Sequence, residues 1–299
     1  MDERDCRILM ELVRAPFETF EGVGARVGVT GTAVKARLAR MEKAGIYAGL
    51  AVGPAPHALG KHARLAVFAQ GGPLVEGDLA ALCRVDEVAW AARAYPTASV
   101  AMLYRDDPGA PVPESLVKAA GRAPDTLVVP ADPRVVAQSA PLSPLDWRVM
   151  RAVMQEPRAS ASRLGVLSGL SAKVAKERRD RMLAEGALMA FPVVDATREE
   201  GAFLYSAYVG AQSPDALRGV RLPNAHRIVT HHEPPGAYLM GYVRTYAEAH
   251  VVEEKLRAMD GVADVTFSVP QGTLLARERL DAWVGAQIER WAQARRAAR

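Results

Sequence analysis

The chain contains little cysteine. Only Cys6 and Cys83 occur among its 299 residues, so the sequence provides neither a disulfide framework nor a metal centre of clustered cysteines. Two of its six histidines, His231 and His232, are adjacent. Adjacent residues of a strand point to opposite faces, which argues against a zinc site built from this pair. We therefore expect no metal and no cofactor.

Long hydrophobic runs are also absent. No segment approaches the roughly 20 consecutive apolar residues of a membrane span. Residues 1–5 are mostly charged and lack the apolar core of a secretion signal. The contents of 49% hydrophobic and 24% charged residues are those of a globular protein. These features predict a cytoplasmic protein with no membrane partner.

Common catalytic motifs are missing from the sequence. It contains no glycine-rich phosphate loop, no nucleophile elbow and no paired-carboxylate signature. This pattern favours binding over catalysis, and we predict that the protein is not an enzyme.

What the chain does have is an internal repeat. A shift of 141 positions superimposes residues 5–46 on residues 146–187 without a gap, and ten of the aligned pairs are identical. Unrelated segments would share far fewer. A repeat of this length indicates a duplicated pair of domains, so we expect the chain to be its own pseudo-dimer.

Each copy begins with three predicted helices. Apolar residues recur at helical spacing in three successive segments, with a turn at Gly28 and a hydroxyl N-cap at Thr30 before the third. Residues 46–52 then read as a short strand pair, or wing. Three helices followed by a hairpin are typical of a winged helix-turn-helix. We place such domains at residues 1–52 and 143–194.

The hydrophobic period changes to two after each helical unit. Strands and helices follow in the order βαββαβ in both copies, which predicts ferredoxin-like modules and an α+β fold. In the second copy a helix is expected at 214–220 and the last strand at 262–269. The first module should occupy residues 62–138 and the second 202–272.

Two further segments complete the expected organisation. Residues 139–143 have the composition of a linker between the copies. Residues 277–299 should form an extra helix whose apolar stripe docks on the body of the protein, with an arginine-rich end.

Positive charge is unevenly distributed along the chain. Basic residues exceed acidic ones by one in residues 1–50, by four in 143–194 and by three in 277–299, whereas 51–142 and 195–276 are slightly acidic. Clustered lysine and arginine give affinity for phosphates, so the distribution favours an anionic partner. Ordinary variation of surface charge would give similar differences.

The first helical unit resembles a known DNA-binding motif. The pattern Thr30-x-x-x-Val34-x-x-Arg37-Leu38-x-x-Met41-Glu42-x-x-Gly45-Ile46, preceded by Asp2-x-x-Asp5-x-x-Ile8-Leu9-x-x-Leu12, resembles the helix-turn-helix of the Lrp/AsnC feast/famine regulators. The second domain of that family is a βαββαβ ligand-sensing module, the order predicted here. The resemblance covers nearly the whole chain and applies twice. It implies a tandemly duplicated transcriptional regulator that binds double-stranded DNA, and we expect self-association through the βαββαβ domains.

DNA contacts would come from the third helix of each unit. Small hydroxyl residues at its N-terminus can enter the major groove, while lysine and arginine further along reach phosphates or guanine edges. The candidates are Thr30, Thr32, Lys35, Arg40 and Lys43 in the first unit, and Ser171, Lys173, Lys176, Arg179 and Arg181 in the second. Lys35 and Lys176 hold the same position of the repeat and are the best candidates. Solvated faces of ordinary helices would look the same.

Other retained charges predict contacts within each unit. Asp5 and Arg37 are expected to form an ion pair between the first and third helices, and Asp146 and Arg178 repeat it. The second copy departs from the pattern at Arg179, where the first has a core leucine. Its third helix is therefore either rotated or closer to a phosphate clamp than to a reader of bases.

The resemblance also implies an effector site between sensing modules. Family members carry a Gly-x-x-Asp turn before the third strand and bind amino acids between subunits. Residues 96–99 lack this turn, and 236–239 keep the glycine without the acid. A small-molecule effector such as an amino acid is expected where the modules meet, near Tyr95, Ser99, Glu233, Gly236 and Tyr238.

Two alternatives to a regulator remain at this point. Siroheme decarboxylases share the fold, and here His231 or His232 could donate a proton while Arg227 or Arg244 held carboxylates. The chain lacks the Arg-x-Gly-Ala-like element and the Asn/Trp-rich strand of those enzymes. The other alternative is an interaction protein that does not bind DNA, in which the recognition helices would be buried against other domains.

Overall fold

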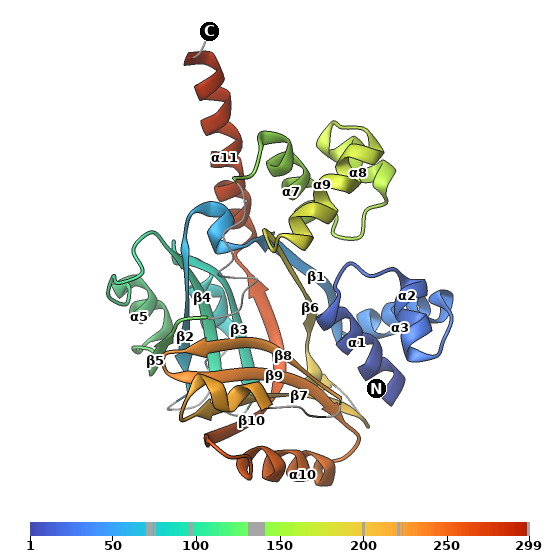
Figure 1. The fold of residues 1–299 in the computed structure, drawn as a ribbon, viewed down its shortest axis with the longest axis vertical. Coiled ribbons are helices and arrows are strands. Elements are labelled where there is room, and N and C mark those ends of the chain that lie inside the picture. The colour runs from blue at the N-terminus through green and yellow to red at the C-terminus, as the bar shows by residue number, and fades with distance from the viewer. Residues whose placement is uncertain are drawn as a thin grey trace.

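Helical units and sheet modules alternate along the chain (Figure 1). The computed structural model describes residues 1–299 except 70–73, 75, 96–97, 131–140, 199–200, 220–221, 223 and 298–299. The expected linker lies partly outside the described residues. Within the described part, no helix is both long and apolar enough to cross a membrane.

The first head consists of α1 (Glu3–Arg14), α2 (Phe20–Val27) and α3 (Gly31–Lys43). Asp2, Thr19 and Thr30 cap the three helices with their side chains. Gly28 ends α2 with φ of 80°, a conformation that favours glycine. The apolar face of α3 then packs into the core of the head, so the three-helix prediction holds for the first copy.

The second head consists of α7 (Pro144–Gln155), α8 (Ala161–Ser168) and α9 (Ala172–Ala184), capped by Ser143, Ser160 and Ser171. Helix α3 buries three apolar side chains, whereas α9 buries only Ala175 and Met182. Arg179 takes the third position and is partly buried beside Asp180. Helix α9 therefore makes fewer buried apolar contacts with its head than α3 does.

The expected hairpin at 46–52 is not formed. Strand β1 (Tyr47–Pro54) instead pairs antiparallel with β6 (Leu188–Val194) of the other copy, with Leu50 opposite Pro192. Gly49, with φ of 87°, lies at an irregularity in the register and does not reverse the chain. Each copy thus supplies one strand, and the hydrogen bonds of a hairpin are replaced by pairing between the copies.

The first module contains β2 (His62–Phe68), α4 (Glu76–Leu82), β3 (Val88–Tyr95), β4 (Ala98–Arg105), α5 (Glu114–Ala120) and β5 (Thr126–Val128). Its strand order is β5-β2-β4-β3. Because side chains alternate along a strand, Phe68 and Leu103 face α4 and α5, while Leu65 and Met102 face the opposite side. A short 3-10 helix, η1 (Pro56–Leu59), precedes the module.

The second module contains β7 (Phe203–Ala211), β8 (Ala225–His232), β9 (Pro235–Val243), α10 (Tyr246–Arg257) and β10 (Val262–Leu275), in the order β10-β7-β9-β8. It follows the 3-10 helix η2 (Ala196–Arg198). The prediction of an α-helix at 214–220 is wrong, because Pro214–Gly219 forms a 3-10 helix, η3. A six-residue segment that starts at proline and ends at glycine is too short for several α-helical turns.

The two modules join into one eight-stranded sheet. Strand β10 runs to Leu275, beyond the expected end at residue 269, and its added length pairs with β3, with Leu275 opposite Trp90. The two edge strands of the sheet, β5 and β8, also approach each other, because Pro130 just after β5 forms an isolated bridge with His231 of β8. The pairing expected of a pseudo-dimer therefore occurs within the chain.

The C-terminal helix α11 (Arg277–Ala297) docks on the body as expected, and its last turns project beyond it (Figure 1). Leu280 and Val284 are buried, and the Trp283 ring stacks on Tyr104 with centroids 5.5 Å apart. Arg151 of α7 forms an ion pair with Asp281, with Nε 3.0 Å from Oδ1. Helix α11 therefore attaches the second head to the first module.

Candidate nucleic-acid interface

The exposed face of α3 presents the predicted contacts of the first head. The Thr30 hydroxyl accepts a hydrogen bond from the Ala33 N–H at 3.1 Å and so caps the helix at its exposed N-terminus. Thr32, Lys35 and Lys43 are also exposed. Within the described residues, neither lysine has an acidic partner. Two cationic side chains of α3 are therefore available to an anion.

The two arginines of α3, in contrast to its lysines, form ion pairs within the head. Arg37 Nη1 lies 2.8 Å from Asp5 Oδ1 and 2.7 Å from Asp2 Oδ2, which confirms the expected pair between the first and third helices. Arg40 Nη2 lies 2.6 Å from the other Asp5 oxygen, although the Arg40 side chain is 60% exposed. Arg40 therefore helps to fix the orientation of α3 on α1. Its contact with DNA stays a prediction.

Every candidate cation of α9 has an acidic partner. Lys176 lies 2.7 Å from Asp180, Arg179 lies 2.7 Å from the same carboxylate, and Lys173 lies 4.0 Å from Glu177. Arg181 reaches Asp146 at 2.6 Å. The hydroxyl of Ser171 caps the helix by accepting from the Val174 N–H at 3.3 Å. The second head has the larger net charge, but among the described residues its third helix, α9, offers fewer unpaired cations than α3.

Asp146 is the buried centre of the second head. Its carboxylate accepts hydrogen bonds from Arg178 at 2.8 Å and from the Ser143 hydroxyl at 2.6 Å. Burial alone would raise the pKa of Asp146, but the hydrogen bonds from Ser143 and Arg178 outweigh it and lower the pKa below the usual 3.8. The expected pair with Arg178 is thus confirmed. Arg37 and Arg178, which hold the same position of the repeat, each join the third helix of a head to its first helix.

The residues expected to bind an effector lie in different surroundings. Tyr95 is exposed, and Ser99 is buried with its hydroxyl accepting from the Leu74 N–H at 2.9 Å. Glu233 is exposed, whereas Gly236 is buried opposite His231. Tyr238 packs against the first module and contacts Tyr208. Only Tyr238 of the five lies in a core cluster shared by both modules, and the site itself stays a prediction.

Of the residues considered for a decarboxylase, the two whose side chains are described, His231 and Arg244, are not brought together. The buried His231 stacks on Tyr208 and its Nδ1 contacts the Pro234 carbonyl. Arg244 pairs with Glu248 just past the other end of β9. Val243 lies seven positions along the extended strand from Gly236, which is opposite His231, and this corresponds to roughly 23 Å. The side chains of His232 and Arg227 lie outside the described part.

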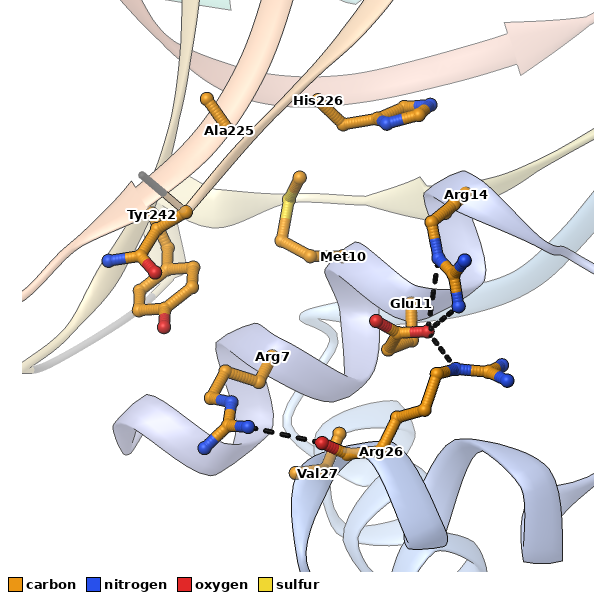
Figure 2. Close-up of a pocket in the computed structure, with 10 residues that line it drawn as sticks. Arg7, Met10, Glu11, Arg14, Arg26, Val27, Ala225, His226 and Tyr242 are labelled. Carbon is orange, nitrogen blue, oxygen red and sulfur yellow. Dashed lines mark hydrogen bonds and ion pairs between the residues drawn. The ribbon is translucent and has the colours of Figure 1, made fainter. Parts of the chain in front are cut away.

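A cleft of about 200 Å³ lies beside the contact between the first head and the second module. Arg7, Arg14 and Arg26 line its helical side, and Asn224 and His226 line the strand side. Figure 2 shows Arg14 and Arg26 converging on Glu11. We predicted none of these residues from the sequence, because the two walls are about 200 positions apart in the chain. The local signal was a set of three arginines and three glutamates in residues 7–26.

Comparison with known proteins identifies the N-terminal unit. Among solved structures, the siroheme decarboxylase NirDL is similar over 97% of this chain and 100% of its own, at 14% identity and a TM-score of 0.44. NirDL in complex with an iron-uroporphyrin III analogue is similar over 96% and 99%, at 13% identity and a TM-score of 0.42. E. coli AsnC is similar over 43% of this chain and 91% of its own, at 18% identity and a TM-score of 0.28. No curated protein sequence matches significantly. Residues 1–42 match the AsnC-type helix-turn-helix domain, so the chain begins with a domain of that type.

Proposed function

We propose that the chain is a DNA-binding transcriptional regulator with two helix-turn-helix heads in one pseudo-dimeric chain, modulated by a small-molecule effector. The observation that carries the proposal is the exposed face of α3 in a domain of the AsnC type, on which Lys35 and Lys43 have no acidic partner among the residues that the structure describes. Free lysines neutralise phosphates and release counterions, which is the main source of affinity for DNA.

The arrangement of α3 suits insertion into the major groove. Thr30 and Thr32 at its N-terminus are small and exposed, so the helix end can approach base edges. Lys35 follows one turn further along. The two arginines bound to Asp5 fix the angle of α3 on its head, and a fixed angle is what a recognition helix needs.

The exposure of both third helices supports a DNA-binding protein over an interaction protein. Burial of Lys35, Lys43, Lys173 and Lys176 against other domains would favour the interaction protein. All four are exposed, and each lies on a helix that remains open to solvent. This supports DNA as the partner.

The two heads would make unequal contributions. The unpaired lysines of α3 favour the first head as the reader of sequence. The cations of α9 must first break their ion pairs with acidic residues before they can bind a phosphate. The second head then acts as a weaker clamp on the backbone. The preferred DNA site is accordingly asymmetric rather than a palindrome.

Selection from a genomic fragment library tests the proposal. The purified chain is incubated with the fragments over a series of salt concentrations, and retained DNA is sequenced. We expect a small set of enriched fragments and retention that falls steeply with salt. The absence of selective retention at low salt would overturn the proposal. A preparation that carries visible tetrapyrrole absorption would instead favour the decarboxylase alternative.

A further inference from the structure

We infer that the cleft between the first head and the second module binds a small anion through its carboxylate or phosphate group, held by Arg7, Arg14 and Arg26. This site differs from the effector position expected between the modules. It is argued below from its charge, its shape and its counterpart in the second copy.

The cleft has an excess of positive charge. Arg14 and Arg26 share a single oxygen of Glu11, with Arg14 Nη2 at 2.7 Å. Arg7 donates to the main-chain oxygen of Arg26 at 3.1 Å and has no acidic partner within the described residues. Three guanidinium groups therefore face one lining carboxylate, Glu11, and Arg26 Nη2 also pairs with Glu18 outside the lining at 2.9 Å, so three cations meet two acids. Guanidinium groups bind carboxylates and phosphates in a bidentate manner, so an anion is the matching ligand.

The pKa of Glu11 agrees with this charge balance. Partial burial opposes ionisation of Glu11, but hydrogen bonds from Arg14 and Arg26 outweigh it and lower the pKa of the carboxyl group. Glu11 therefore stays ionised at neutral pH and orients both arginines. Arg14 directs Nε and Nη2 at Glu11 and Arg7 uses Nη2, so both keep N–H groups for a ligand, whereas Arg26 is held by Glu18 as well.

The shape of the cleft limits the ligand to a small molecule. Its volume is about 200 Å³, and Met10, Val27 and Tyr242 provide an apolar part of the lining (Figure 2). Small-molecule sites combine such apolar surface with a few polar groups that fix orientation. A compact organic acid or phosphate ester has this combination of properties.

The second copy shows how the equivalent position is filled. There α11 lies against α7 and buries Val284 in the core of the second head. In the first copy α1 contacts β8 and β9 directly, and no comparable helix covers the cleft within the described part. The repeat positions of Glu11, Arg14 and Arg26 carry Ala152, Gln155 and Leu167. One side is closed by a helix, and the other is open and lined by arginines.

The position of the cleft links ligand binding to the first head. Leu204 and Tyr242 of the second module pack into the core of that head, next to the cleft. An anion held between α1, α2 and β8 would favour one orientation of the head over others. This consequence rests on the proposed function, whereas binding of the anion does not.

Calorimetric titration of the full chain tests the site. The probes are inorganic phosphate, citrate and phenylacetate at low ionic strength, and the arm that binds identifies the anionic group. We expect saturable binding of at least one probe, weakened about tenfold or more by Arg14→Gln, which introduces the residue type of the second copy. The matched control is Arg4→Gln, an exposed arginine of the same helix outside the cleft.

The outcomes separate the two proposals. No binding of any probe to the wild-type chain, or equal losses in Arg4→Gln and Arg14→Gln, would overturn the site. Circular dichroism of both variants confirms that they are folded. DNA affinity is then measured with and without the bound probe, and a several-fold change in the wild-type chain but not in Arg14→Gln supports coupling. Anion binding without any DNA binding would leave the site standing and contradict the proposed function.

Discussion

Arg37 reaches from α3 to Asp5 on α1, with Nη1 2.8 Å from Oδ1. Arg178 and Asp146 repeat this contact in the second head at the same 2.8 Å. Both aspartates are buried, so each pair fixes the third helix on the first. Charges retained in both copies therefore hold the heads together, and the difference between the heads lies in whether their lysines are paired.

Replacement of Asp146 should produce a pH-dependent loss of stability. The folded-state pKa of Asp146 lies below 3.8, so its ionised form stabilises the fold above that pH, and this contribution is lost as the pH falls through the folded-state value. Asp146→Asn should lower the free energy of unfolding by about 1–3 kcal/mol at pH 7. In urea titrations the difference from wild type should shrink below pH 3.8. The control Glu177→Gln, at an exposed residue, should change little.

A loss of stability in Asp146→Asn that is equally large at pH 3 and pH 7 would contradict this role. It would indicate that the side chain acts through its shape and its capping hydrogen bond rather than through its charge.

Shortening of Leu280 should weaken the attachment of α11. This side chain is 3% exposed and packs against the first module beside Gly53. Leu280→Ala should reduce the free energy of unfolding by about 2–4 kcal/mol, because it leaves a cavity. Trp291→Ala on the same helix should cost less than about 1 kcal/mol, because Trp291 is 40% exposed. Similar thermal shifts for the two variants would contradict the docking described above.

Pairing of β1 with β6 can be tested by a disulfide. Val52 and Ala190 are opposite each other in the register, so their side chains lie on the same face. The double variant Val52→Cys/Ala190→Cys should form a disulfide on mild oxidation, detected by mass spectrometry of the linked peptides. The pair Ala51→Cys/Ala190→Cys is one residue out of register and should form little. Equal yields from both pairs would rule out the register.

The helices could be predicted from the sequence because their signals are local. Apolar spacing and the hydroxyl caps such as Thr30 and Ser171 mark three helices in each copy. The strand at 46–52 was also readable, but its partner was not. Strand β6 follows about 140 residues later, and nothing local distinguishes a hairpin from pairing between copies. The extension of β10 to Leu275 has the same origin, since its partner is β3 of the other module.

The candidate sites were predictable only in part. The repeat and its helical spacing placed basic residues on both third helices, but they did not show which of these residues are paired. The spacing of Lys176 and Asp180, four residues apart on a helix, was a readable sign of pairing. The cleft was not predictable in this way, because Arg14 and His226 meet only after both copies have folded together.

The most direct test of the account is the salt dependence of DNA affinity in two single-lysine variants. Fluorescence anisotropy would measure binding to an enriched fragment for the wild-type chain, Lys35→Ala and Lys176→Ala. Lys35 has no acidic partner in the described part, whereas Lys176 lies 2.7 Å from Asp180. We expect Lys35→Ala to reduce the slope of log affinity against log salt by about one and to weaken binding, with a smaller change for Lys176→Ala. Wild-type binding by Lys35→Ala, or a larger loss for Lys176→Ala, would contradict the assignment of the first head as the principal DNA reader.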